Sequence, residues 1–384
     1  MASLNIIPNG ALLIRNGIIQ EVGSSRRIEN LVHARNAHEV DATGRVVMPA
    51  FIDPDVALLR LDPGELATAP DSSRALKLMA RKRVIGHAGA AAAELARYGV
   101  LSAGAHTGAA GDLRNATKLL RAHQILRLKP IRIRSIFAPH FPEAAAGDSA
   151  AALDTFATKW LPALRRKKLC SVVELALDGS ALEAPVWPFD FATLHSAAVA
   201  AATLGFALRL RAPRAPTPRQ LEFAFAAGAI GVIGRIEGDP RSFAQRLVSI
   251  GCIRVVPSSE AFDDPPRAAA AIRTAIDEGA AIALSSSYRA AGFSCLNPQH
   301  LLHLAVDRLG LGAEEAIVAT TWNAACTLRL SQVVGSLEPG KSADVLVMDV
   351  PDYRELSRRA GHHDVNVVMR MGQLLARGPA LSVD

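Results

Sequence analysis

Short strand-like apolar runs alternate with alanine-rich helical stretches through the middle of the chain, and this alternation limits the fold more than any other feature. The runs that read as strands are residues 45–53, 100–106, 131–137, 171–177, 206–211, 229–234, 253–257 and 281–287. Helical patterns separate most of them, for example at 88–97, 113–127 and 189–204. Eight strands with intervening helices predict an α/β fold, a closed parallel (β/α)8 TIM-type barrel. An open doubly wound sheet is the alternative, but no GxGxxG-like turn follows the first strand.

Both ends of the chain are rich in strand patterns. Apolar residues flank an Asn16-Gly17 pair near the N-terminus, which is a strong hairpin signal. Similar strands are expected near 345–348 and 367–369. We therefore predict a small β-sandwich domain built from both termini, in which residues 12–22 share a sheet system with the two C-terminal strands. The predicted boundaries are 1–46 and 335–384 for the composite domain and 47–334 for the barrel.

Composition places the chain among globular proteins. Half of its 384 residues are hydrophobic and 21% are charged, so it can bury a sizeable core. No apolar stretch is long enough to cross a membrane, and the N-terminus lacks the pattern of a signal peptide. The cysteines form no CxxC pair: Cys170, Cys252, Cys295, Cys326. Reduced thiols and a cytoplasmic location are expected.

The net charge of +7 comes from basic residues spread along the chain, with short clusters at 81–83 and 165–168. Base-stacking aromatic residues do not interleave with these clusters, so they favour solvated helix faces. We predict no nucleic-acid partner and no membrane partner.

Two segments resemble a known family. Residues 46–57, Val-Val-Met-Pro-Ala-Phe-Ile-Asp-Pro-Asp-Val-Ala, are similar to the amidohydrolase signature Pro-Gly-hydrophobic-hydrophobic-Asp-Pro-His-x-His at the end of the first barrel strand. Residues 334–344 resemble the turn by which these chains leave the barrel and return to the β-sandwich, and residues 350–356 narrow the resemblance to the imidazolonepropionase branch. The likeness covers nearly the whole chain in order and is strongest at both ends.

The resemblance implies a single bound metal that activates water to open a cyclic amide-like bond. Two histidines spaced His-x-His on a strand point to the same side and can reach one ion. In this chain these positions hold Asp55 and Ala57, and Ala57 offers no donor. Asp55 is either a remaining ligand or a solvated or salt-bridged carboxylate.

The other positions that the resemblance implies also hold different residues. The third histidine ligand, which ends the fifth strand, falls on Arg211, and the acid–base glutamate falls on Arg214. The histidine after the sixth strand falls near Gly234, and the aspartate that ends the eighth strand falls on Ser287. The substrate-contacting histidine after the third strand falls on Ala138. Arginine stays protonated and is no ordinary metal ligand, so we expect no metal and no other cofactor.

Several histidines and Asp53 are further candidates for functional residues. His106, at the end of the second strand, is a weak catalytic candidate beside Asp55, and His140 is a similar one; both are more often structural. Asp53 reads as a structural hydrogen-bonding residue at a strand end. His300 and His303 share a helix face and could chelate a surface ion, although such pairs usually do nothing.

Arginines are expected to occupy the volume of the absent metal. Arg211 projects into it, and Arg209 shares its side of the strand. A buried guanidinium needs an anionic partner, which is Asp55 or an anionic ligand. The predicted ligand-binding set is Asp55, Arg209, Arg211, Arg214, Ser287, Tyr288 and Arg289. Arg60 and Arg134 are expected to line the same mouth together with Arg289 and to make it electropositive.

These patterns predict a pseudoenzyme, a protein that keeps an imidazolonepropionase-like scaffold without its catalytic apparatus. Its expected role is non-catalytic: it binds a small anionic ligand or a partner, as a homodimer or beside an active relative. The alternative is an active metal-dependent hydrolase of cyclic C–N bonds with a displaced or shared metal. A third reading is metal-free chemistry at the arginine-rich mouth. Asp55, Ala57, Arg211 and Ser287 are expected to converge there.

Overall fold

The computed structural model describes residues 4–59, 72–108, 110, 112–139, 149–176, 191–212, 222–223, 226–234, 239–288 and 295–377. Eight parallel strands form one sheet, in which each strand pairs with the next along the chain. They are β4 (Phe51–Val56), β5 (Val100–His106), β6 (Arg132–Phe137), β7 (Val172–Ala176), β8 (Ala207–Ala212), β9 (Gly231–Gly234), β10 (Ile253–Pro257) and β11 (Ile282–Ser285). The predicted barrel is confirmed.

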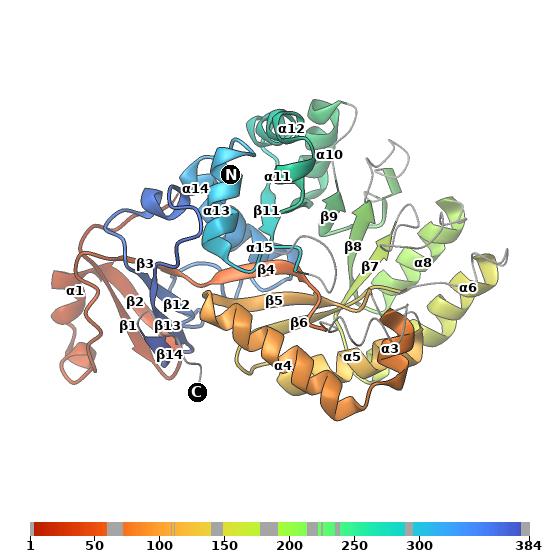
Figure 1. Cartoon of the computed structure of the whole chain (residues 1–384), viewed down its shortest axis with the longest axis horizontal. Helices are drawn as coiled ribbons and strands as arrows, with labels where there is room; N and C mark the ends of the chain where they lie inside the picture. The colour runs from red at the N-terminus through yellow and green to blue at the C-terminus, as the bar shows by residue number, and fades with distance from the viewer. Residues whose placement is uncertain are drawn as a thin grey trace.

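Helices surround this sheet (Figure 1). They are α3 (Ser72–Leu78), α4 (Arg81–Arg97), α5 (Leu113–Leu126), α6 (Ser149–Thr155), η3 (Phe156–Trp160), α7 (Leu161–Arg166), α8 (Phe191–Thr203), α10 (Pro240–Ile250), α11 (Glu260–Asp263), α12 (Pro265–Asp277), α13 (Pro298–Asp307), α14 (Ala313–Thr320) and α15 (Trp322–Thr327). Side chains at their N-termini explain where some begin, because Asp112 accepts a hydrogen bond from the Asn115 amide and Asn297 accepts one from the Gln299 amide. None of the described helices is both long and apolar enough to span a membrane.

Alternation along the strands divides the apolar residues into two cores. One set faces the helices, for example Leu208 and Leu210 of β8. The other set lies inside the barrel, where Ile136 and Val255 pack against Leu328, just after α15. The inward positions nearer the strand ends are not apolar. They hold the charged side chains of the candidate site.

The barrel seam lies between its first and last strands, β4 and β11. Within the described residues no backbone ladder joins these two strands, and side chains make the connection together with one backbone hydrogen bond just beyond the strands, from the Ala57 amide to the Tyr288 carbonyl oxygen. Asp53 Oδ1 accepts hydrogen bonds from Ser285 Oγ at 2.9 Å and from the Asp55 amide at 3.1 Å. Asp53 Oδ2 accepts from the Ser286 amide at 3.2 Å and from the Ser286 hydroxyl. The structural role predicted for Asp53 fits these contacts.

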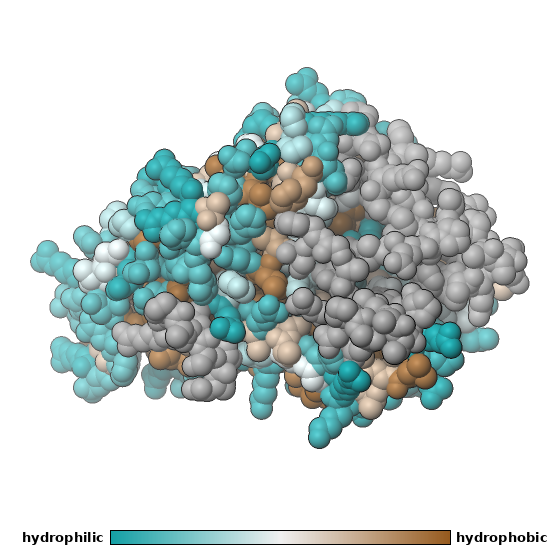
Figure 2. Space-filling model, in the orientation of Figure 1, coloured by the Kyte–Doolittle hydropathy of each residue, from teal (hydrophilic) through white to brown (hydrophobic). Residues whose placement is uncertain are grey.

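The antiparallel strands from both termini lie together at one end of the molecule (Figure 1). The strand β3 (Val46–Pro49) pairs with β12 (Val345–Met348), and the sheet continues through β13 (Val365–Arg370) to β14 (Gln373–Arg377). Short helices α1 (Ser25–Glu29), η1 (Val32–Ala34) and η4 (Tyr353–Ser357) complete this part. On the face shown in Figure 2, hydrophilic side chains cover most of this end of the molecule.

Two expectations about this end were wrong in detail. The hairpin β1 (Gly10–Arg15) and β2 (Ile18–Ser24) forms its own two-stranded sheet and does not join β12 and β13. A bridge between Ile18 and Ser342, with neighbouring backbone hydrogen bonds such as that from the Ile19 amide to the Lys341 carbonyl oxygen at 2.9 Å, links it to the C-terminal segment. The predicted strand 45–53 is two strands, because the Ala50 amide bonds to the Asp344 carbonyl oxygen at 3.0 Å and the chain passes there from one sheet into the barrel.

Candidate functional site

Four charged side chains meet inside the barrel near the carboxyl ends of three strands. Asp55 lies on β4, Glu174 on β7, and Arg209 and Arg211 on β8. Arg209 and Arg211 are two residues apart, so both point to the same side of the strand. The parallel register places Glu174 opposite Arg209. Strand geometry therefore assembles two carboxylates and two guanidiniums within one volume.

Every member of this ion-pair network contacts both members of opposite charge. Arg211 donates from Nη2 to Asp55 Oδ1 and from Nε to Glu174 Oε1, each at 2.6 Å. Arg209 donates from Nη2 to Glu174 Oε2 at 2.9 Å and, more weakly, to Asp55 Oδ1 at 3.4 Å. The predicted pairing of Arg211 with Asp55 is confirmed as a contact. The formal charges of the four groups cancel.

The network is nearly closed to solvent. Asp55 and Arg209 are 0% exposed and Glu174 is 3% exposed. Burial alone would lower the pKa of Arg211, but Asp55 and Glu174 outweigh it and raise that pKa above its ordinary value. Burial alone would raise the pKa of Glu174, but Arg211 and Arg209 hold it below its ordinary value. Both pKa shifts favour the charged forms, so the ion pairs persist at neutral pH.

Arg209 also fixes the backbone of the first strand, because its Nη1 donates to the Pro54 carbonyl oxygen. The neighbouring strand approaches this carbonyl closely at Gly104. A Cβ atom on Gly104 would lie 2.4 Å from the Pro54 oxygen and 2.6 Å from Leu328 Cδ2. Gly104 therefore lets β5 pack against the part of β4 that Arg209 holds.

Gly104→Ala is expected to destabilise the protein by about 2 kcal/mol or more, since the added methyl group meets a backbone oxygen that Arg209 keeps in place. Chemical denaturation measures the change. The matched control is Gly86→Ala in α4, where a new Cβ meets nothing within 4 Å. That substitution is expected to be neutral or to stabilise by up to about 1 kcal/mol. Equal effects of the two variants would contradict the close packing at Gly104.

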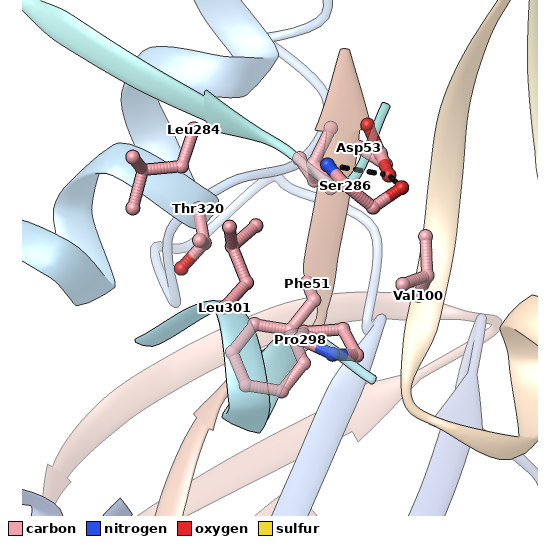
Figure 3. A pocket seen from close by; sticks show the side chains of 9 residues that line it. Phe51, Asp53, Val100, Leu284, Ser286, Pro298, Leu301 and Thr320 are labelled. Carbon is pink, nitrogen blue, oxygen red and sulfur yellow. Dashed lines mark hydrogen bonds between the residues drawn. The ribbon is translucent and has the colours of Figure 1, made fainter. Parts of the chain in front are cut away.

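Asp53 belongs to a separate polar group beside the network. Burial raises its pKa to about 6, although hydrogen bonds from Ser286, Asp55 and Ser285 oppose that rise. Figure 3 shows Asp53 and Ser286 together at the edge of a small cavity that Leu284 and Leu301 also line. The cavity lies between the sheet and α13, outside the barrel interior. Asp53 thus serves the seam and does not face the ion-pair network.

His106 lies at the edge of the network. Its Nδ1 accepts a hydrogen bond from the Gly108 amide at 3.2 Å, which leaves the proton of the neutral ring on Nε2. Nε2 is 3.9 Å from Asp55 Oδ1, longer than a hydrogen bond. The structure therefore brings this weak catalytic candidate close to Asp55.

The other predicted residues lie beside the network, outside the described residues, or in another part of the barrel. The Ala57 amide bonds to the Tyr288 carbonyl oxygen at 2.7 Å, so Ala57 and the segment after β11 lie side by side. Ser287 has a positive φ of 51°. In the described part of the chain its buried hydroxyl has no hydrogen-bond partner. Four predicted positions lie outside the described residues: Arg60, His140, Arg214, Arg289.

Two predicted positions face elsewhere. The Tyr288 side chain packs into the core between barrel and helices, and its hydroxyl donates to Glu94 of α4 at 3.5 Å, so it does not line the mouth. Arg134 lies near the amino end of β6, where its Nη1 donates to Ser171 Oγ at 3.2 Å, just before β7 begins. Arg134 therefore belongs to the opposite end of the barrel, and its predicted place at the mouth was wrong.

In the described part of the chain, no three His, Cys, Asp or Glu side chains are arranged to hold a metal ion. His300 and His303 of α13 are held by other contacts. His303 Nδ1 lies 2.9 Å from the Ser357 carbonyl oxygen, and the His300 ring stacks on the His303 ring.

Sequence reasoning missed Glu174. A signal was present, because Glu174 is the single charged residue in the apolar run Ser-Val-Val-Glu-Leu-Ala-Leu at 171–177. A lone carboxylate at an inward position of a buried strand needs a cationic partner. Only the register between β7 and β8 identifies that partner as Arg209 and Arg211.

A model of the amidohydrolase family matches residues 260–375. The imidazolonepropionase of Brevibacillus brevis is 26% identical over 401 residues, which cover 98% of this chain and 92% of that protein. The imidazolonepropionase of Solibacter usitatus is 27% identical over 416 residues, which cover 99% and 94%.

Solved structures are similar in fold. The crystal structure of an amidohydrolase superposes with a TM-score of 0.72 at 16% identity, and the match covers 97% of this chain and 95% of that one. A 5-methylcytosine deaminase from Klebsiella pneumoniae gives a TM-score of 0.71 at 15% identity, with coverages of 100% and 97%. At these identities the likeness concerns the barrel and its attached sheets.

Proposed function

Because this chain belongs to the amidohydrolase superfamily, in its imidazolonepropionase-like branch, we propose that it is a non-catalytic member whose ion-pair network replaces the catalytic metal. The observation that carries the proposal is the contact of Arg211 with Asp55 and Glu174, each at 2.6 Å. Arg211 stands where the resemblance places a metal ligand. Its fixed positive charge would repel a divalent cation from the same volume.

The donors at the family's ligand positions do not fit a divalent metal. Asp55 is already bound by two guanidiniums. Ala57 and Gly234 have no side-chain donor, and the Ser287 hydroxyl is a weak neutral ligand. A metal ion needs several neutral or anionic donors at about 2 Å. These four positions therefore do not supply the set of donors that a divalent metal needs.

The proposed role is the binding of a small ligand or of a partner at the carboxyl end of the barrel, where barrel sites are built. Arg209 and Arg211 are each paired with carboxylates. An anion at this mouth would have to compete with Asp55 and Glu174. The proposal therefore does not require the ligand to be anionic.

A second candidate function is an active hydrolase of cyclic C–N bonds that uses a displaced metal. The likeness to curated imidazolonepropionases over nearly their whole length favours it, since those relatives are enzymes. This candidate needs donors outside the described strand ends. An active hydrolase would contain metal and turn over substrate, whereas the non-catalytic proposal predicts neither.

One experiment separates the two. The full chain is purified from cells supplemented with zinc and iron, analysed for bound metals, and assayed with imidazolonepropionate and other cyclic amides. We expect far less than one metal per chain and no turnover above the uncatalysed rate, whereas the imidazolonepropionase of Brevibacillus brevis, purified in parallel, serves as the active control. Near-stoichiometric metal, with turnover lost in Asp55→Ala, would refute the non-catalytic role.

A further inference from the structure

A second group of arginines lies at the opposite end of the barrel, where the strands begin. Arg132 and Arg134 are two positions apart on β6, so both point to the same side of the strand. Arg132 Nη2 lies 3.2 Å from Ser342 Oγ and 3.4 Å from Asp344 Oδ2, both in the segment that leads into β12. These contacts place the start of β6 against the small four-stranded sheet.

The small sheet adds a third guanidinium to the same place. Arg370 ends β13, and its Nη1 donates to the Leu128 carbonyl oxygen. Leu128 forms a β-bridge with Arg132, so Arg370 and Arg132 lie beside each other. We call Arg132, Arg134 and Arg370 the basal arginine cluster.

The basal arginine cluster is short of negative charge. Asp344 is its one carboxylate among the described residues, at 3.4 Å from Arg132. Asp344 Oδ1 is already bound by Ser342 Oγ at 2.8 Å and by the Met371 amide at 2.9 Å. The ion-pair network at the mouth balances two arginines with two carboxylates, whereas the basal cluster sets three arginines against one.

Unused donors accompany this imbalance. In the described part of the chain, the Nε atoms of Arg132, Arg134 and Arg370 are buried and have no hydrogen-bond partner. Burial lowers the pKa of Arg134, and the positive charges of Arg132 and Arg329 lower it further. Burial also lowers the pKa of Arg370, where Arg132 acts against the favourable charge of Asp344. Guanidiniums remain protonated, so a bound anion would offset their mutual repulsion.

We propose that the basal arginine cluster binds a phosphoryl oxyanion, either inorganic phosphate or the phosphate group of a metabolite. Guanidiniums match such an anion because their planar donors can form paired, charge-assisted hydrogen bonds to its oxygens. The anion would connect the barrel, through Arg132 and Arg134, with the small sheet, through Arg370. The site is separate from the mouth and does not depend on the function proposed above.

Thermal unfolding and calorimetric titration of the full chain test the proposal. Inorganic phosphate, a sugar phosphate and a nucleoside monophosphate are compared with chloride at matched ionic strength. We expect phosphate-bearing compounds to raise Tm, and Arg134→Met and Arg370→Met to weaken binding by about tenfold or more. If inorganic phosphate alone binds, the source is the free ion; tighter binding of one organic phosphate identifies a metabolite.

The matched control is Arg166→Met, which removes the same charge from an exposed position of α7. It should leave phosphate binding unchanged. Arg134→Lys keeps the charge but loses the paired donors, so we expect it to weaken phosphate binding as well. It replaces Arg134→Met in the test if that variant fails to fold. The proposal is overturned if phosphate raises Tm no more than chloride does. It is equally overturned if the basal variants and Arg166→Met bind phosphate alike.

Discussion

Arg209→Met is expected to lower the free energy of unfolding by about 3–5 kcal/mol, because it leaves two buried carboxylates with one guanidinium. Methionine keeps much of the length of the side chain, so the main loss is charge and hydrogen bonding. The substitution also removes the donor to the Pro54 carbonyl oxygen. Urea denaturation followed by circular dichroism measures the change.

The matched control for this prediction is Arg273→Met. Arg273 also binds two carboxylates, Asp277 and Glu315, each at 2.9 Å, but its side chain is 39% exposed. Exposed pairs of this kind contribute about 0–1 kcal/mol. If Arg209→Met cost no more than Arg273→Met, the ion-pair network would be irrelevant to stability.

Adding Glu174→Gln to Arg209→Met is expected to restore part of the lost stability. Each substitution alone leaves an uneven number of charges, whereas the double variant leaves Asp55 paired with Arg211 at 2.6 Å. A double-mutant cycle should therefore give an interaction energy of about 2 kcal/mol between positions 174 and 209. Denaturation of the wild type, both single variants and the double variant supplies the cycle.

A distant pair provides the reference for this cycle. Glu315→Gln combined with Arg209→Met should be additive within about 0.5 kcal/mol, because Glu315 binds Arg273 and, among the described residues, makes no hydrogen bond or ion pair with Arg209. An additive result at 174 and 209 as well would mean that the two residues act independently. That result would contradict a network in which the charges must balance.

Much of the barrel could be predicted from the sequence because its strands are buried apolar runs. The predicted ranges 100–106 and 253–257 agree with β5 and β10 in full. The range 45–53 was wrong because no local pattern shows that the Ala50 amide bonds to Asp344, far away in the sequence. The boundary between two sheets depends on such distant partners, and the periodicity of apolar residues does not reveal which partner a residue has.

The site was predictable only in part for a similar reason. Asp55 and Arg211 could be predicted as site residues. The family resemblance gives their positions, and a buried guanidinium needs an anionic partner. Glu174 was missed because its role follows from the strand register. Arg134 was misplaced because alternation shows which side of the sheet a residue faces but not which end of the barrel it reaches. Tyr288 faces α4 because the chain after β11 passes through the positive φ of Ser287.

The barrel seam has a cost in chain entropy. The hydrogen bond between Asp53 and Ser285 joins residues 232 positions apart. Closing a flexible loop of that length costs on the order of 5 kcal/mol. The hydrogen bonds that Asp53 accepts have to offset this cost together with the contacts around them, since no backbone ladder assists them among the described residues.

The sheet built from both termini reduces that cost. Ala50 alone separates β3 from β4, so the pairing of β3 with β12 already holds the start of the barrel near the C-terminal part of the chain. The loop that remains, from Ser285 to Val345, is about fourfold shorter, which lowers the entropy cost of the seam by about 1 kcal/mol. The small sheet therefore acts on the barrel as a cross-link would, and it stabilises a junction that lies outside its own hydrogen bonds.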